Sequence, residues 1–133
     1  MAKEITYRIE ADVKKRVKKL LDQHNWFWWM PPANGFGKVG ISDFNAFRAG
    51  IFLAVETKFG KNKPTAQQKA FLESILAESG FAFVVSEKNI DWFEAWLAAF
   101  DRAAASAGKN QPVEPEDGAT MLNAMRELTA GIQ

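Results

Sequence analysis

Two apolar segments, 39–47 and 51–59, lie so close together that they constrain the fold more than any other feature of the sequence. Only Arg48, Ala49 and Gly50 separate them, and short connections that contain glycine are typical of tight turns. Apolar runs joined in this way predict two neighbouring antiparallel strands. The sequence therefore predicts a β-hairpin in the middle of the chain.

The second strand of this hairpin carries two charged side chains on one face. Because alternate side chains of a strand share a face, Val55 points one way while Glu56 and Lys58 point the other. Asp43 joins their face only if the two residues that face each other across the hairpin have numbers that sum to an odd value. A two-residue loop at Ala49-Gly50 gives such a sum, because it places Arg48 opposite Ile51 and Asp43 opposite Glu56. We therefore expect a loop of even length, or a bulge that corrects the parity, with Asp43 opposite Glu56.

The remaining segments show helical or strand-like patterns. Apolar residues recur at helical spacing in three of them, and two short apolar runs have the length of strands. The predicted elements are a helix over 8–22, strands over 26–30, 39–47 and 51–59, a helix from near Thr65 to Gly80, a strand over 81–85, and a helix after Asn89 with Trp92, Trp96, Leu97 and Phe100 as its apolar stripe. This order predicts an α/β (α+β) fold with a mixed central sheet.

The composition places these elements in one globular domain. Of the 133 residues, 47% are hydrophobic and 25% are charged, a balance that supports a buried core. We predict a single domain over residues 1–102. Residues 103–133 are expected to form a linker and a short amphipathic helical extension, which docks either on the domain or on a second copy of the chain.

Several classes of protein and of site are excluded or disfavoured. The absence of Cys excludes disulfides and thiolate metal sites, and the lone His24, interpreted as structural, excludes multi-histidine zinc sites. No stretch reaches the roughly 20 apolar residues of a membrane span. The segment Met1 to Glu10 has no apolar run typical of a signal peptide. We therefore expect a cytoplasmic protein with no membrane partner.

Positive charge is concentrated in the first half of the chain. Residues 1–69 carry 13 Lys and Arg against 6 Asp and Glu, whereas residues 70–133 carry 4 against 10. This asymmetry favours a face that binds a polyanion, most commonly nucleic acid, although an idle dipolar surface is the alternative. The basic clusters lie on the predicted first helix, at Lys14, Lys15, Arg16, Lys18 and Lys19, and in the loop after the hairpin, at Lys61 and Lys63.

The charged residues of the hairpin need a chemical explanation, because a buried charge costs several kcal/mol unless it is paired or bound to a metal. Asp43 and Glu56 would be accommodated if they held a divalent cation, with Lys58 facing a reacting phosphate. Mg²⁺ prefers oxygen ligands, typically one or two carboxylates with retained waters, and it promotes phosphoryl chemistry. The alternative is a surface strand with an ordinary Glu–Lys pair.

Five features occur in a fixed order between Glu10 and about Val85. They are Glu10 at the head of the first helix, Gly40-Ile-Ser-Asp43, Glu56-Thr-Lys58, Thr65-Ala-Gln-Gln68, and then Phe71, Leu72 and Gly80. In this order they resemble the PD-(D/E)XK nucleases, and more closely the VRR-NUC branch of phage and repair enzymes, which are Holliday-junction-resolvase-like. The chain departs from that branch at Ser42 and Ala66, where the branch has Pro. Neither position supplies a ligand.

The resemblance implies a restriction-endonuclease-like αβββαβ core with extra C-terminal helices. It further implies that Asp43, Glu56 and the Thr57 backbone carbonyl ligate Mg²⁺ or Mn²⁺. Glu10 would bind or orient a water of that ion, or hold a second ion. Lys58 would then be the catalytic lysine.

Gln68 has two interpretations at this point. The resemblance implies that it supports the catalytic site, whereas Thr65 and Gln68 also match the capping box of a helix start. The residues expected to contact nucleic acid are Lys14, Lys15, Lys18, Lys61 and Lys63. Trp26, Trp28 and Trp29 either stack on bases or pack in the core.

The expected function is that of a metal-dependent endonuclease acting on duplex or branched DNA, of phage or bacterial type, in the cytoplasm of the host cell. Small members of the branch often act as dimers, so a homodimer is expected as well. One alternative is a non-catalytic DNA-binding or phage accessory protein that keeps the fold, although the intact Glu56 and Lys58 argue against it. The other is an enzyme of unrelated fold in which the Glu-x-Lys pattern is accidental.

Overall fold

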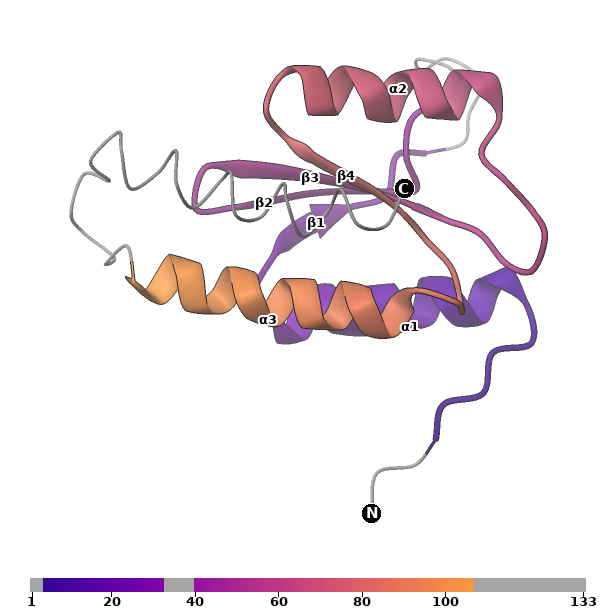
Figure 1. The fold of residues 1–133 in the computed structure, drawn as a ribbon, viewed down its shortest axis with the longest axis horizontal. Helices are drawn as coiled ribbons and strands as arrows, with labels where there is room; N and C mark the ends of the chain where they lie inside the picture. The colour runs from indigo at the N-terminus through magenta and orange to yellow at the C-terminus, as the bar shows by residue number, and fades with distance from the viewer. Residues whose placement is uncertain (1–3, 33–39, 107–133) are drawn as a thin grey trace. The chain divides into compact units, whose positions relative to one another are not determined.

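The computed structural model describes residues 4–32 and 40–106. Within these residues the elements are α1 (Glu10–Gln23), β1 (Phe27–Trp29), β2 (Phe44–Arg48), β3 (Ile51–Thr57), α2 (Ala66–Ala77), β4 (Phe81–Val85) and α3 (Ile90–Ser106) (Figure 1). The chain divides into two compact units, Met1–Ile90 and Asp91–Gln133, which are described separately. The predicted order of helices and strands is confirmed.

The strands form a mixed sheet in the order β1-β2-β3-β4. β2 pairs antiparallel with both β1 and β3, whereas β3 and β4 run parallel. Parallel neighbours need a crossover connection, and α2 supplies it. Helix α2 lies on one face of this sheet and α1 on the opposite face (Figure 1). The predicted α+β class with a mixed sheet is therefore confirmed.

A two-residue turn, Ala49-Gly50, joins β2 to β3, with φ angles of 50° and 77°. Positive φ at both central residues is typical of the type I′ turn, whose twist matches that of the flanking strands. The facing pairs continue down to Phe44 opposite Val55, so their residue numbers sum to an odd value. The predicted even loop is confirmed. One step beyond the end of β2, Asp43 therefore lies opposite Glu56.

The core of the first unit occupies both faces of β3. On one face Ala54 packs with Leu72 of α2 and Ala82 of β4. On the other face α1 buries its predicted apolar stripe of Val13, Val17, Leu20 and Leu21. Because β3 has strands on both sides and helices on both faces, every residue from Leu53 to Thr57 is buried. The charged side chain of Glu56 is buried for the same reason.

Local hydrogen bonds move the start of the first helix from its predicted position. α1 begins at Glu10 rather than at residue 8. The Asp12 carboxylate accepts hydrogen bonds from the backbone N–H groups of Arg8 and Ile9, at 2.8 and 3.1 Å. These two residues therefore form the approach to the helix rather than its first turn.

Helix α3 differs from its prediction in two details. Its buried stripe is Phe93, Trp96, Leu97 and Phe100, while Trp92 is only half-buried. The helix continues to Ser106, past the boundary predicted at residue 102. The rest of the predicted linker and C-terminal extension lies outside the described residues. Neither α3 nor any other helix in the described ranges is long and apolar enough to cross a membrane.

The hairpin turn generates a stability prediction. Ala49 holds a φ of 50°, which a residue with a Cβ rarely adopts, whereas Asn tolerates it and Asn-Gly is the preferred type I′ pair. We expect Ala49→Asn to stabilise the protein by about 0.5–1 kcal/mol and to raise its melting temperature by about 2–5 °C. Circular dichroism melts would measure the shift.

The matched control is the same substitution in a right-handed helical backbone. Ala70 is exposed on α2, and Ala70→Asn should lower the melting temperature because Asn is the poorer helix former. A melting temperature that falls for Ala49→Asn as well would contradict the type I′ assignment.

Candidate functional site

A glycine holds the loop that carries Asp43 against the start of α2. Gly40 has a φ of 81°, and a Cβ at this position would lie 2.6 Å from the backbone carbon and oxygen of Gln67. Only glycine meets both conditions. Beyond it, Ser42 is buried and donates a 2.8 Å hydrogen bond to Asn45 Oδ1. The strand predicted from residue 39 therefore begins later, and Asp43 is fixed just before it.

The Asp43 carboxylate extends the pairing of the two strands beyond the last backbone rung. Its Oδ2 accepts hydrogen bonds from the backbone N–H and the hydroxyl of Thr57, at 2.9 and 2.6 Å. Thr57 is fully buried, whereas the Asp43 side chain is 22% exposed. Asp43 is thus held rigidly on its inner side while its outer side reaches solvent.

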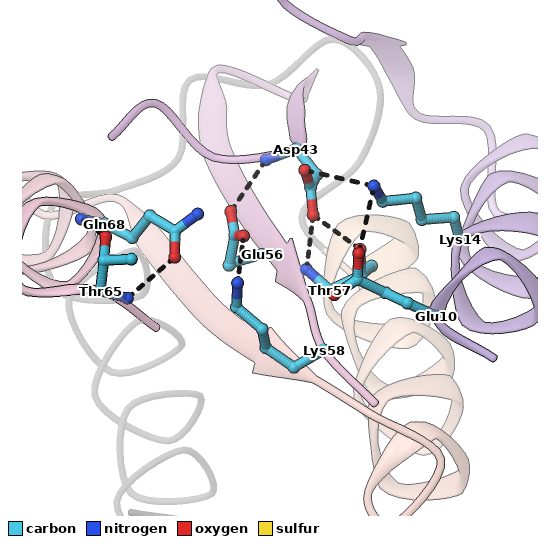
Figure 2. A network of polar contacts seen from close by, with 8 residues as sticks. All are labelled: Glu10, Lys14, Asp43, Glu56, Thr57, Lys58, Thr65 and Gln68. Atoms are coloured by element: carbon cyan, nitrogen blue, oxygen red, sulfur yellow. Dashed lines mark hydrogen bonds and ion pairs between the residues drawn. The ribbon is translucent and has the colours of Figure 1, made fainter. Parts of the chain in front are cut away.

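Glu56 lies beside the backbone of Asp43, while the Asp43 carboxylate itself is directed to Thr57 and to Lys14 of α1. Its Oε2 accepts a 3.2 Å hydrogen bond from the Asp43 backbone N–H, and its Oε1 lies 3.3 Å from Lys58 Nζ (Figure 2). The Lys58 side chain is 15% exposed, while that of Glu56 is 2% exposed. The structure therefore brings the three residues of the predicted centre together.

Burial controls the protonation of this carboxyl group. The pKa of Glu56 rises from its ordinary 4.5 to about 7, because burial and, to a smaller extent, the negative charge of Asp43 disfavour the ionised form. The Lys58 ammonium, with its hydrogen bond to Glu56, acts in the opposite direction and only partly offsets the rise. A second positive charge next to the two carboxylates would favour the ionised form.

Glu10 is connected to Asp43 by an ion pair with Lys14 and not by a direct contact of its own. Lys14 Nζ lies 3.4 Å from Glu10 Oε2 and 3.8 Å from Asp43 Oδ1, so it stands between the two carboxylates (Figure 2). Lys14 was predicted to contact nucleic acid, and these two ion pairs were not predicted from the sequence. The spacing of Glu10 and Lys14, four residues apart on a helix, is the signal that could have indicated the first of them.

The donor atoms fit a hydrated divalent cation better than a closed metal site. Across residues 4–32 and 40–106, no three His, Cys, Asp or Glu side chains form a group that could hold a metal ion. Two adjacent carboxylates, Asp43 and Glu56, nevertheless match what Mg²⁺ requires when it retains several waters. The direct participation of Glu10 is the least supported part of the predicted ligand set.

The backbone at Thr57 is oriented in agreement with its predicted role. The N–H of Thr57 points to Asp43, whereas the N–H of Lys58 donates to Val85 on β4. Since the N–H and C=O of one strand residue point to the same side, the Thr57 carbonyl is directed toward the side where Asp43 lies. This carbonyl is the third oxygen available to a cation there.

Gln68 takes part in the start of α2. Its backbone N–H donates to Thr65 Oγ1 at 3.2 Å, and its Oε1 accepts from the Thr65 backbone N–H at 2.9 Å. This is the predicted capping box. Its proposed supporting role at the catalytic site stays a prediction.

The other predicted nucleic-acid contacts lie at the surface. Lys15, Lys18 and Lys19 of α1 are exposed, and so are Lys61 and Lys63 of the loop after β3.

No protein-family model matches this sequence, and no curated protein matches it.

The buried carboxyl group predicts a pH dependence of stability. Because its folded pKa is about 7 and its ordinary value is 4.5, the folded protein retains a proton that the unfolded chain releases between these pH values. In EDTA, the free energy of unfolding should therefore fall as the pH rises from about 4.5 to 7. Glu56→Gln should remove this contribution and be the more stable protein at pH 8, by about 1–3 kcal/mol. Urea titrations across this pH range would measure it.

Glu73→Gln is the matched control, because Glu73 is exposed on α2. It should keep the slope of the parent protein. Equal slopes for the parent and Glu56→Gln would show that folding leaves the pKa of Glu56 unchanged, which would contradict the prediction.

Proposed function

We propose that this protein is a Mg²⁺- or Mn²⁺-dependent deoxyribonuclease that hydrolyses phosphodiester bonds, with Asp43, Glu56 and Lys58 at its centre. The observation that carries the proposal is that Glu56 accepts a hydrogen bond from the backbone of Asp43, whose carboxylate is close enough to raise the pKa of Glu56, while Lys58 Nζ lies 3.3 Å from Glu56 Oε1. The αβββαβ order from α1 to β4 is the order that the proposed PD-(D/E)XK core requires, and the proposed VRR-NUC-like branch rests on the sequence motifs alone.

The residues of the chain divide the work between holding a cation and acting on the phosphate. Asp43, Glu56 and the Thr57 carbonyl would hold the ion. When bound, a divalent cation supplies a nucleophilic water and neutralises charge on the phosphoryl oxygens. Lys58 provides a fixed positive charge that stabilises the extra negative charge of the transition state. The 15% exposure of its side chain leaves it accessible from solvent.

The ion pairs around the centre keep these groups in place before substrate arrives. Glu56 holds the Lys58 ammonium, and Lys14 holds the outer oxygen of Asp43. Because catalysis by positioned charges depends on small reorganisation, such prior positioning lowers the cost of the reaction step. DNA in the cytoplasm of a phage- or bacterium-type cell is the proposed substrate.

A second candidate function is a non-catalytic DNA-binding protein of the same fold. It is favoured by the lack of a three-residue acidic or histidine cluster in the described part of the chain. A titration with Mg²⁺ separates the two functions, because a binding protein needs no cation to hold DNA, whereas the nuclease needs it for turnover.

The roles of the three central residues can be separated by mutation. Asp43→Asn and Glu56→Gln should lose both Mn²⁺ binding and cleavage, because they remove charged oxygen ligands. Lys58→Met should keep Mn²⁺ binding and lose about 10²–10³-fold in cleavage rate, because it removes only a transition-state contact. Calorimetry with Mn²⁺ and gel assays on plasmid and junction DNA would measure both properties.

Lys69→Ala is the matched control, since Lys69 is exposed on α2 and takes no part in the centre. It should bind Mn²⁺ and cleave like the parent. The nuclease assignment fails if Lys58→Met cleaves at the parent rate, or if the parent cleaves nothing while it still binds DNA.

The exposed lysines of α1 predict how binding responds to salt. Glu10, Lys14 and Lys18 are spaced four residues apart, so Lys18 continues the side of the helix that faces the centre. If Lys15 and Lys18 contact phosphates, each change to Ala should reduce the slope of log K against log salt by about 0.9. Fluorescence anisotropy in EDTA would measure the slopes, with Lys69→Ala as the control. Unchanged slopes would identify these residues as a solvated helix face.

A further inference from the structure

A group of aromatic side chains lies uncovered on one face of the sheet. Phe27, Trp29 and Phe47 are 72%, 39% and 45% exposed, and Phe52 lies half-buried beside them. We call these four residues the aromatic face. Clusters of exposed apolar side chains on a folded protein usually mark a site of interaction.

Strand geometry determines which of the tryptophans near the aromatic face is exposed. Trp26 precedes β1 and is 4% exposed. Trp28 points to the opposite side of the sheet from Trp29, where it contacts Phe44 and donates its Nε1–H to Asp22. Of the tryptophans proposed either to pack or to stack on bases, Trp29 is thus the one on the exposed face.

Strand register places the aromatic face beside the candidate centre. Trp29 pairs with Asn45, and Asn45 with Ala54, so these side chains share the face of Glu56. Glu56 lies in the next row on that face, two residues along β3, or about 7 Å away. Trp29 therefore borders the centre, and the row of Phe27, Phe47 and Phe52 lies two residues farther along the strands.

The rings of the aromatic face support one another. Trp29 and Phe47 are nearly parallel, with an angle of 17° between their planes and 6.1 Å between centroids. Phe52 packs edge-on against Phe47 at 4.9 Å. Side chains held in this way present π surfaces without further loss of conformational freedom on binding.

We propose that the aromatic face binds unpaired bases of a single-stranded DNA segment next to the phosphodiester that is cleaved. This inference rests on the proposed nuclease function and adds its substrate class. A strand whose phosphate lies at the centre must continue past it, and its bases can stack on exposed rings whatever the sequence. Bases in a duplex are already stacked and must be unpaired first, which costs a few kcal/mol. The substrate is thus DNA with a single-stranded part, such as a flap or a splayed end.

The test compares single-stranded and duplex DNA in binding assays that need no metal. Trp29→Leu and Phe27→Leu keep apolar surface and remove the π system. In EDTA, each should weaken binding of labelled oligo(dT) by about 5- to 100-fold and change binding of a duplex of equal length by less than about twofold. Ile5→Ala, at another exposed apolar residue outside the aromatic face, should change neither.

Melting curves would first show that the variants fold. With Mg²⁺, Trp29→Leu should lose activity on flaps but not on plain duplex. The inference is overturned if Trp29→Leu weakens binding of oligo(dT) and of duplex equally, or if it leaves oligo(dT) binding unchanged. It is also overturned if the parent is a dimer that Trp29→Leu converts to monomers while oligo(dT) binding stays the same, because the aromatic face would then be a dimer interface. If the parent protein cleaves duplex DNA in these cases, the nuclease function stands and only the inference fails. If it cleaves no DNA, the proposed function fails too.

Discussion

The register of the β2–β3 hairpin is the constraint on which the rest of the candidate site depends. A strand has two faces, so a shift of one residue would carry Asp43 to the face opposite Glu56. The two-residue turn at Ala49-Gly50 prevents this shift. Positive φ angles at both of its residues are typical of the type I′ turn, whereas the other common hairpin turn, type II′, has a positive φ only at the first. Gly40 and Ser42 then hold the far end of β2, so the carboxylates are positioned from both ends of one hairpin.

The same geometry produces an electrostatic conflict that the neighbouring residues only partly resolve. Glu56 is buried because β3 is the central strand, and Asp43 stands beside it, so both effects raise the pKa of Glu56. Thr57 donates twice to Asp43, and Lys14 and Lys58 contribute positive charge. Functional sites often keep charged groups that the protein does not fully neutralise, because a bound ligand or substrate can supply the missing opposite charge.

Local pattern was sufficient to predict the elements that depend on neighbours in the sequence. The hairpin loop, the shared face of Glu56 and Lys58, and the capping box of Thr65 follow from strand and helix periodicity. The contacts that were missed depend on strand order and on how segments distant in sequence approach. Lys14 of α1 meets Asp43 just before the start of β2, and Gly40 meets the backbone of Gln67. Likewise, the exposure of Trp29 depends on the place of β1 in the sheet, at an edge, and on the face that Trp29 occupies.

The sequence separation of the paired strands has a consequence for the order of folding. Phe44 and Val55 pair across a short loop, whereas Leu53 and Phe81 pair only after the whole crossover through α2 has closed. Local contacts of this kind generally form faster than distant ones. The two carboxylates therefore meet while both are still hydrated, and Glu56 loses its water only when α2 and β4 arrive. We therefore expect its burial to fall on the late side of the folding barrier, where an unfavourable energy speeds unfolding more than it slows folding.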